Sequence, residues 1–160
     1  RKTSQERASI MEIEKFKKAI SRFKRVAADS SCFIYFLEDN PKFGDLAELI
    51  FELAEKNRLS IISSMLVSVE VLTGYRRAND HSAENEFKQM LKDFPNIEMY
   101  EASNKLVDRI VDLRTKYGVK TPDAIHLATA IEHKADVFVT NDRQLKKVKE
   151  IVMLYLGDYA

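Results

Sequence analysis

The sequence predicts an α/β fold in which helices flank an open, mostly parallel sheet and an extra basic helix precedes it. Short apolar runs alternate along the chain with segments of helical periodicity, the pattern of a parallel sheet with helical crossovers. These runs are apolar throughout, as expected of strands that are covered on both faces. With 160 residues, the chain is long enough for one domain with a self-sufficient core.

The first 25 residues predict a basic amphipathic arm. Apolar residues recur with helical spacing at Ile10, Ile13, Phe16, Ile20 and Phe23. Residues 1–25 carry nine Lys and Arg against three Glu, whereas residues 26–160 carry 17 Lys and Arg against 22 Asp and Glu. Such an arm could approach a polyanion such as RNA, lie against acidic surface of its own chain or a neighbour, or be a solvated helix. We therefore divide the chain into an arm, 1–25, and a folded domain, 26–160.

Within the folded domain, apolar runs and turn residues indicate five strands. We expect them at 25–29, 59–63, 97–100, 136–140 and 151–156. Helices are expected at 32–37, 45–56, 65–77, 80–94, 103–117 and 122–134, with a turn and short helix at 141–148. Ser30 and Ser31 are expected to cap the first of these helices, and Thr121 to cap the sixth, with Pro122 in its first turn.

The composition indicates a protein of a reducing compartment that does not cross a membrane. Cys32 is the single cysteine, so an internal disulfide is excluded, and we expect it to pack in the core. No apolar run approaches the roughly 18 residues of a membrane span, and the first 25 residues lack the apolar core of a signal peptide. We expect a cytoplasmic protein.

Four acidic residues stand near the ends of the predicted elements. Asp29 ends the first strand, and Asp142 follows the fourth strand by two residues. Both should lie at the carboxyl edge of the sheet, where ligands of open parallel sheets bind. Glu70, about two turns into the helix after the second strand, reaches that edge if its helix leans over it. The place of Asp123 stays open. It begins the helix 122–134, and an antiparallel pair of this helix with 103–117 does not obviously bring that start to the carboxyl edge of the sheet.

Three segments carry a resemblance to a known family. They are VAADSSCFIYFL, IISSMLVSVEVLTG and TPDAIHLATAIEHKADVFVTND, and the last is the most specific. They resemble the signature segments of PIN-domain ribonucleases, especially the VapC-type toxins of toxin–antitoxin pairs, over residues 26–156. The resemblance implies that four acids meet in one pocket, namely Asp29, Glu70, Asp123 and Asp142. It also implies supporting hydroxyl groups at Ser30 and Thr140. Members of this type begin almost directly at the first strand, so the arm is a departure.

The resemblance further implies a metal-dependent endoribonuclease. Clustered carboxylates repel one another unless cations compensate, and oxygen ligands select Mg²⁺ or Mn²⁺. We expect Asp29 and Asp123 to contact the metal directly, and Glu70 and Asp142 to do so directly or through water. The implied partners are an RNA substrate, a second copy in a homodimer, and an antitoxin protein that fills the pocket with basic side chains.

Other interpretations of the same residues remain. Each acid alone is more typical of a cap or a solvated surface group. A catalytically silent PIN-like module that binds RNA or protein is the main alternative. A phosphoacceptor receiver domain is disfavoured, because the first strand ends in one Asp and the strand ending at Tyr100 offers none.

Several further side chains could have either a structural or a binding role. We interpret His126 as a structural histidine rather than a base. The lysines could grip phosphates or be solvated, and the aromatic residues could stack on bases or belong to the core. These side chains are Lys146, Lys147, Lys149, Phe33, Tyr35 and Phe36.

Overall fold

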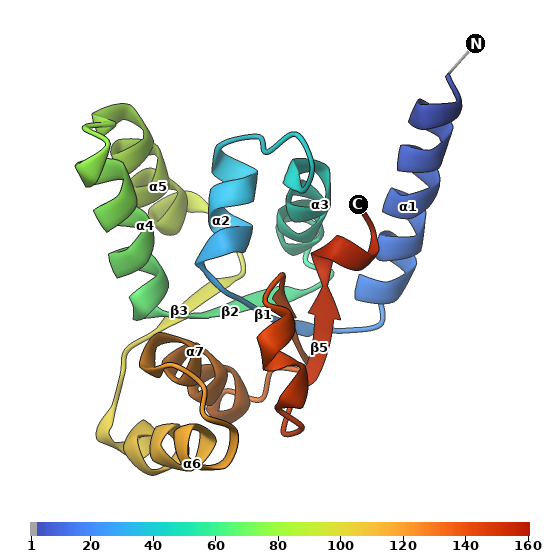
Figure 1. Ribbon diagram of the computed structural model, residues 1–160. Coiled ribbons are helices and arrows are strands. Elements are labelled where there is room, and N and C mark those ends of the chain that lie inside the picture. Colours follow the sequence, from blue (N-terminus) through green and yellow to red (C-terminus); the bar gives the residue numbers. More distant parts are fainter. Residues whose placement is uncertain (1–2) are drawn as a thin grey trace.

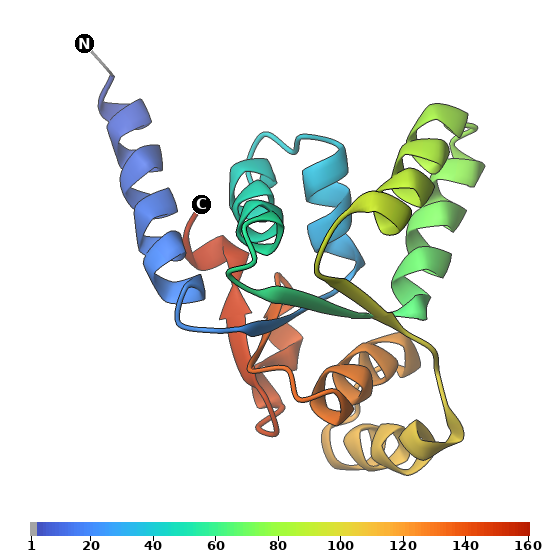
Figure 2. The ribbon, with the colours of Figure 1, turned by 180° about the vertical axis from the view of Figure 1, so that it is seen from behind.

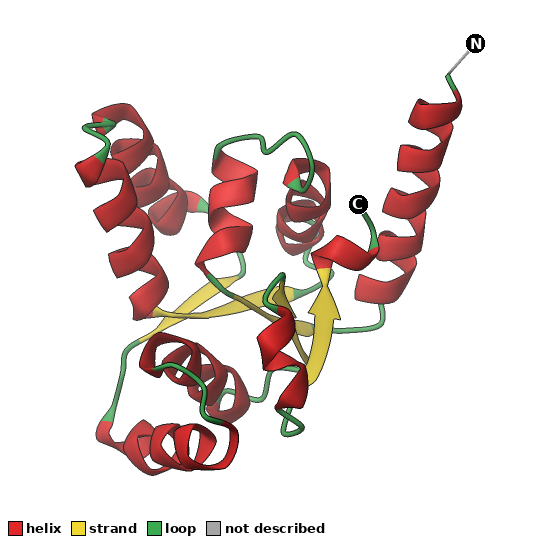
Figure 3. Ribbon diagram, viewed as in Figure 1, coloured by secondary structure: helices red, strands yellow, loops and turns green. Residues whose placement is uncertain are grey.

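The computed structural model describes residues 3–160 and contains one five-stranded sheet with the strand order β3-β2-β1-β4-β5. Every pairing in it is parallel, so the predicted α/β class is confirmed. The strands are β1 (Arg25–Ala28), β2 (Ser60–Ser64), β3 (Ile97–Tyr100), β4 (Val137–Thr140) and β5 (Val152–Tyr155). Figure 3 shows them as a single twisted layer between helices.

Helices cover both faces of this sheet. The helices are α1 (Ser4–Ile20), α2 (Ser30–Leu37), α3 (Gly44–Glu55), α4 (Met65–Arg77), α5 (His81–Asp93), α6 (Val107–Tyr117) and α7 (Thr121–Glu132). Three 3-10 turns complete the elements: η1 (Asn104–Leu106), η2 (Arg143–Lys147) and η3 (Leu156–Asp158). Helices α1 to α5 lie on one side of the sheet, and α6 and α7 pack together on the other (Figures 1 and 2). Within residues 3–160, no helix combines the length and the apolar character that crossing a membrane requires.

Successive residues of β1 serve the two core layers in turn. Val26 and Ala28 belong to the core beneath α1 to α5, whereas Ala27 belongs to the core beneath α6 and α7. This alternation follows from the pleat of a strand. Because β1 lies at the centre of the sheet, the residue that follows it, Asp29, emerges at the middle of the carboxyl edge.

The predicted arm forms α1 and packs against its own chain. Thr3 caps the helix in a reciprocal pair with Glu6, whose carboxylate accepts the Thr3 N–H at 2.7 Å. Phe16 and Ile20 are fully buried, and the Phe16 ring meets Tyr159 edge-on at 5.2 Å between centroids. The buried face is thus satisfied by contacts with α3 and with the last residues of the described chain.

The helix ends differ from the expected ones at three places. The helix α1 ends at Ile20, so Phe23 lies beyond it in the turn that leads to β1. The cap of α2 is Asp29, whose carboxylate accepts the Ser31 N–H, so the expectation that Ser30 and Ser31 cap this helix is wrong. Thr121 is the first residue of α7 rather than its cap.

Candidate active site

Asp29 is held at the centre of the carboxyl edge by two neighbouring elements. Its Oδ1 accepts hydrogen bonds from Ser31 N at 3.2 Å and Ser31 Oγ at 2.7 Å. Its Oδ2 accepts from Thr140 Oγ1 at 2.9 Å. Although the residue keeps some exposed surface, burial of the carboxyl raises its pKa, and the bonds from Ser31 and Thr140 oppose that rise. Burial thus disfavours the ionised form of the Asp29 carboxyl, and these hydrogen bonds favour it.

The serine that supports Asp29 is Ser31 and not Ser30. Asp29 is the residue before the first turn of α2, so its side chain folds over that turn to the N–H of the second helical residue. Ser30, the first helical residue, makes no hydrogen bond to Asp29 among the described residues. The sequence offers a hydroxyl group at both Ser30 and Ser31. Because Asp29 caps the helix, only the hydroxyl of Ser31 reaches its carboxylate.

Thr140 connects Asp29 with Asp142. Its hydroxyl donates to Asp29 and accepts the Asp142 N–H at 3.0 Å. Asp142 caps the turn η2 by accepting the Gln144 N–H through Oδ1 at 2.9 Å, which leaves its second oxygen without a partner among the described residues. The strand β4 pairs with β1, so both acids stand at adjacent strand ends.

Asp123 lies with the other three acids, which the helix order alone did not establish. It sits half-buried in the first turn of α7. Burial raises its pKa, and the negative charges of Asp142, Asp29 and Glu70 raise it further, while His126 opposes them. The helix α7 packs against β2 and α4, which brings its start to the edge of the sheet.

Glu70 is bound by His126, a contact that the sequence interpretation missed. The Nε2 of His126 lies 2.5 Å from Glu70 Oε1. The His126 side chain is 4% exposed, and its Nδ1 is buried without a partner among the described residues. His126 is therefore buried, as expected, but it contacts a site residue. The available signal was its position three residues after Asp123, which puts both side chains on one face of a helix.

The chemistry of the site fits a divalent cation, although its side chains are not yet arranged around one. Its donors are carboxylate oxygens, which hard ions such as Mg²⁺ and Mn²⁺ prefer. Three hydrogen bonds engage the Asp29 carboxylate, and one each engages those of Glu70 and Asp142. In the part of the chain that the structure describes, no three His, Cys, Asp or Glu side chains are placed so that they could hold a metal ion. Binding one would require these carboxylates to turn toward each other.

The remaining candidates divide between core and surface. Cys32 is buried beside the Val139 carbonyl, and burial raises the pKa of its thiol well above the usual value, so it packs as expected. Phe33 meets Phe51 edge-on in the core, and the partly buried Phe36 stacks on the same ring. Tyr35 differs from them, because its hydroxyl accepts a hydrogen bond from Asn141, next to Asp142. The three lysines after Asp142 are exposed on and beyond η2, namely Lys146, Lys147 and Lys149.

The model of the PIN domain matches residues 26–151. The chain belongs to the PIN-domain family. The match begins at the first residues of β1, so the arm lies outside it. No curated protein sequence matches the chain significantly.

Solved structures share the PIN fold at low sequence identity. The Rickettsia felis VapBC2 structure, bound to a DNA fragment from its promoter, has a chain with a TM-score of 0.68 and 20% identity, covering 82% of this chain and 98% of that one. A chain of a toxin–antitoxin complex from Klebsiella pneumoniae has a TM-score of 0.61 and 22% identity, and the match covers 79% of this chain and 95% of that one. A chain of the DNA-bound VapBC from Salmonella typhimurium has a TM-score of 0.60 and 18% identity, and the match covers 83% of this chain and 98% of that one.

Proposed function

We propose that this PIN domain is a VapC-type endoribonuclease that hydrolyses phosphodiester bonds of RNA with the help of Mg²⁺ or Mn²⁺. The observation that carries the proposal is the environment of Asp123. Its carboxyl lies within the electrostatic reach of Asp29, Glu70 and Asp142. Among the described residues, no Lys or Arg forms an ion pair with any of these four acids. A cluster of carboxylates without a Lys or Arg partner is typical of a cation site.

In this proposal, Asp29, Glu70, Asp123 and Asp142 hold the ion. Such an ion, when bound, supplies a Lewis acid that polarises the phosphate and lowers the pKa of the attacking water. The chain supplies the orientation. Thr140 and Ser31 fix both oxygens of Asp29. His126 fixes one oxygen of Glu70 and leaves the other available. These hydrogen bonds already restrict the rotation of the side chains. Each carboxylate therefore has less conformational freedom to lose when it becomes a ligand.

The proposed partners follow from the structural neighbours. The neighbours from Klebsiella pneumoniae and Salmonella typhimurium are toxin–antitoxin and VapBC complexes. We extend to this chain an antitoxin whose basic side chains cover the acidic pocket, and a cytoplasmic location. A homodimer is also proposed, with the exposed apolar side chains of Met65 and Val69 on α4 as one surface for it.

A silent PIN-like binding module is the second candidate. The observation that favours it is the absence of a ready metal-holding group within residues 3–160. In that case the acids would serve only as caps and partners of buried donors, as Asp29 and Asp142 already do. The two candidates predict different results in a cleavage assay.

The deciding experiment is cleavage of end-labelled single-stranded RNA with Mg²⁺, with Mn²⁺ and with EDTA. We expect metal-dependent cleavage that falls by at least about 100-fold in Asp29→Asn and in Asp123→Asn. The matched control is Asp112→Asn, an exposed acid on α6, which should cleave as the wild type does. If wild type, variants and EDTA samples show the same traces of cleavage, the nuclease proposal fails and the binding module remains.

A further inference from the structure

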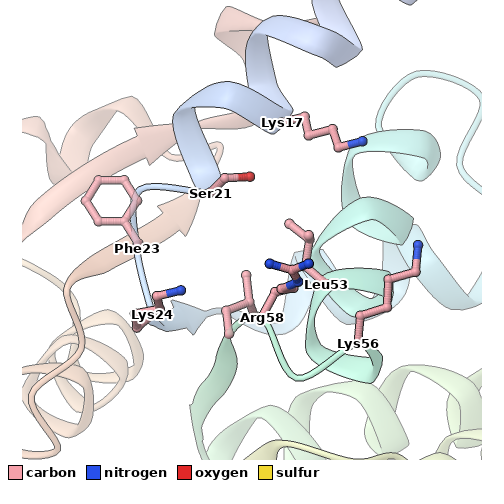
Figure 4. A pocket seen from close by; sticks show the side chains of 8 residues that line it. Lys17, Ser21, Phe23, Lys24, Leu53, Lys56 and Arg58 are labelled. Carbon is pink, nitrogen blue, oxygen red and sulfur yellow. The ribbon is translucent and has the colours of Figure 1, made fainter.

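A basic pocket lies where the end of α1 meets the end of α3 (Figure 4). Its volume is about 340 Å³, and its lining residues are Lys17, Ser21, Phe23, Lys24, Leu53, Lys56, Arg58 and Leu59. Lys24 directly precedes β1 and Leu59 directly precedes β2. The pocket therefore lies at the amino ends of the strands, opposite the edge that carries the acids.

The polar side chains of this pocket are hydrogen-bond donors. Lys56 forms an ion pair with Glu52. In residues 3–160, no ion pair or hydrogen bond engages the side chains of Lys17, Lys24 or Arg58. The hydroxyl of Ser21 adds a further donor. A ligand that fits this lining must supply acceptors and negative charge.

The attraction of helix C-termini for cations explains only part of the positive charge of this pocket. The last carbonyl groups of α1 and α3 attract cations, which explains Lys17 and Lys56. Lys24 and Arg58 lie beyond both helices, and Figure 4 shows their ends turning toward the space between α1 and α3. Asp136 forms no ion pair with the Lys24 ammonium among the described residues; its Oδ2 accepts the backbone N–H groups of Lys24 and Arg25. Like charges that share a pocket favour an anionic ligand.

We propose that this pocket binds the phosphodiester backbone of the single-stranded RNA on which the chain acts, an inference that rests on the proposed function. Phosphate offers acceptor oxygens with negative charge, which suits a lining of donors. Phe23 borders the pocket but packs partly against the core, and Figure 4 shows its ring turned away from the basic side chains.

The pocket depends on the arm. Lys17, Ser21, Phe23 and Lys24 precede the matched region, 26–151, whereas the other lining residues lie within it. The site therefore exists only when α1 is docked on α3, and a PIN domain without this arm would not form it. The excess positive charge of residues 1–25 thereby gains a specific role.

The distance between the basic pocket and the acidic edge sets the shortest RNA that can contact both. Five residue steps of extended chain lead from Lys24 through β1 to Asp29, about 16 Å at the usual rise of a parallel strand. A stacked strand advances about 3.4 Å for each nucleotide, so at least about five nucleotides are needed. The path over the surface is longer than the straight line, which makes this a minimum.

The test measures binding of fluorescently labelled single-stranded RNA to the full chain by anisotropy in EDTA, at several salt concentrations. The variant is Lys24→Gln with Arg58→Gln, and its control is Lys92→Gln with Lys105→Gln, which removes the same charge from exposed positions on α5 and η1. We expect the pocket variant to bind RNA more weakly, with a salt slope smaller by about 0.7 for each lost phosphate contact. The loss should be greater for an RNA longer than about five nucleotides than for a dinucleotide.

Binding and cleavage fail separately in this design. If the pocket variant loses RNA affinity while the wild type shows no metal-dependent cleavage, the pocket inference stands and the nuclease proposal fails. If both variants bind RNA as the wild type does, the pocket inference is overturned, whatever the cleavage result. If polyglutamate binds and depends on Lys24 and Arg58 while RNA does not, the pocket serves an acidic protein and the RNA inference is overturned.

Discussion

The Nε2 of His126 lies 2.5 Å from Oε1 of Glu70, a bond that joins α7 to α4 at the acidic edge of the sheet. The ring donates from Nε2, because a proton on Nδ1 would be buried without an acceptor among the described residues. Glu70 is 37% exposed, so this bond restrains a side chain that solvent would otherwise leave free. His126 is in this view a positioning residue for a proposed metal ligand.

Replacing His126 should therefore weaken metal binding. We expect His126→Ala to lower the affinity for Mn²⁺ by about 10- to 100-fold, the usual effect of losing a group that orients a ligand. Free Mn²⁺ measured by electron paramagnetic resonance reports this directly, without any cleavage assay. His133→Gln, at the end of the same helix and stacked on Tyr100, is the matched control. Equal affinities of wild type and His126→Ala would exclude the positioning role.

Neutralising Asp123 should stabilise the metal-free protein. Burial and the neighbouring charges raise the pKa of this carboxyl from 3.8, so the folded state holds its charge at a cost. The cost is absent below pH 3.8, appears as the unfolded state ionises, and is complete once the pH passes the folded pKa. In EDTA at neutral pH, Asp123→Asn should melt a few degrees above the wild type, and this gain should vanish in acid.

Added Mn²⁺ should reverse that order, because an ion bound to the acids stabilises only the protein that binds it. The wild type should gain melting temperature with Mn²⁺, and Asp123→Asn should gain little. An Asp123→Asn protein that is less stable than wild type in EDTA would contradict the inferred repulsion. Thermal unfolding followed by circular dichroism is sufficient for both comparisons.

Phe16 tests whether α1 is part of the core. This side chain is fully buried against Tyr159, so Phe16→Ala should cost about 3–5 kcal/mol in the free energy of unfolding. Ile10 lies on the same helix but is 41% exposed, and Ile10→Ala should stay within about 0.5–1 kcal/mol. Urea unfolding measures both. Similar small losses in the two variants would mean that the arm is a separate, weakly docked element.

Glu84 gives the fold a stabilising contribution that disappears in acid. Its side chain is 8% exposed and pairs with Arg76 and Lys88, and hydrogen bonds from them lower its pKa from 4.5 to about 2. A lowered pKa means that the contribution is complete above pH 4.5 and is lost as the pH falls toward 2. Glu84→Gln should therefore be less stable than the wild type at pH 7, and this difference should shrink steadily as the pH falls from 4.5 toward 2. A difference that persists unchanged into acid would indicate packing rather than charge.

The sequence predicted most where local chemistry decides the structure. The helix α4 was predicted with both of its ends, because Ser64 supplies a side-chain cap and a two-residue turn follows Arg77. The carboxyl-edge positions of Asp29 and Asp142 followed from the parallel sheet itself. The place of Asp123 depends on how α6 and α7 pack, which no local pattern encodes, and there the family resemblance was needed.

The contacts that the sequence did not reveal join distant segments. Glu70 and His126 are 56 residues apart and carry no mark that pairs them. The choice between Ser30 and Ser31 rests on which residue begins α2, and helix ends are the least certain part of a prediction. The basic pocket needed α1 and α3 in place, because its lining comes from both sides of residue 26.

The contact between Phe16 and Tyr159 has a consequence for synthesis. A ribosome makes α1 before the sheet, and its aromatic partner emerges only after the whole sheet has been completed. Contacts between residues so far apart in the chain form late, because a long loop must close before they can form. During translation, α1 can therefore meet α3 and form the basic pocket well before Tyr159 is made, and the contact of Phe16 with Tyr159 is added last.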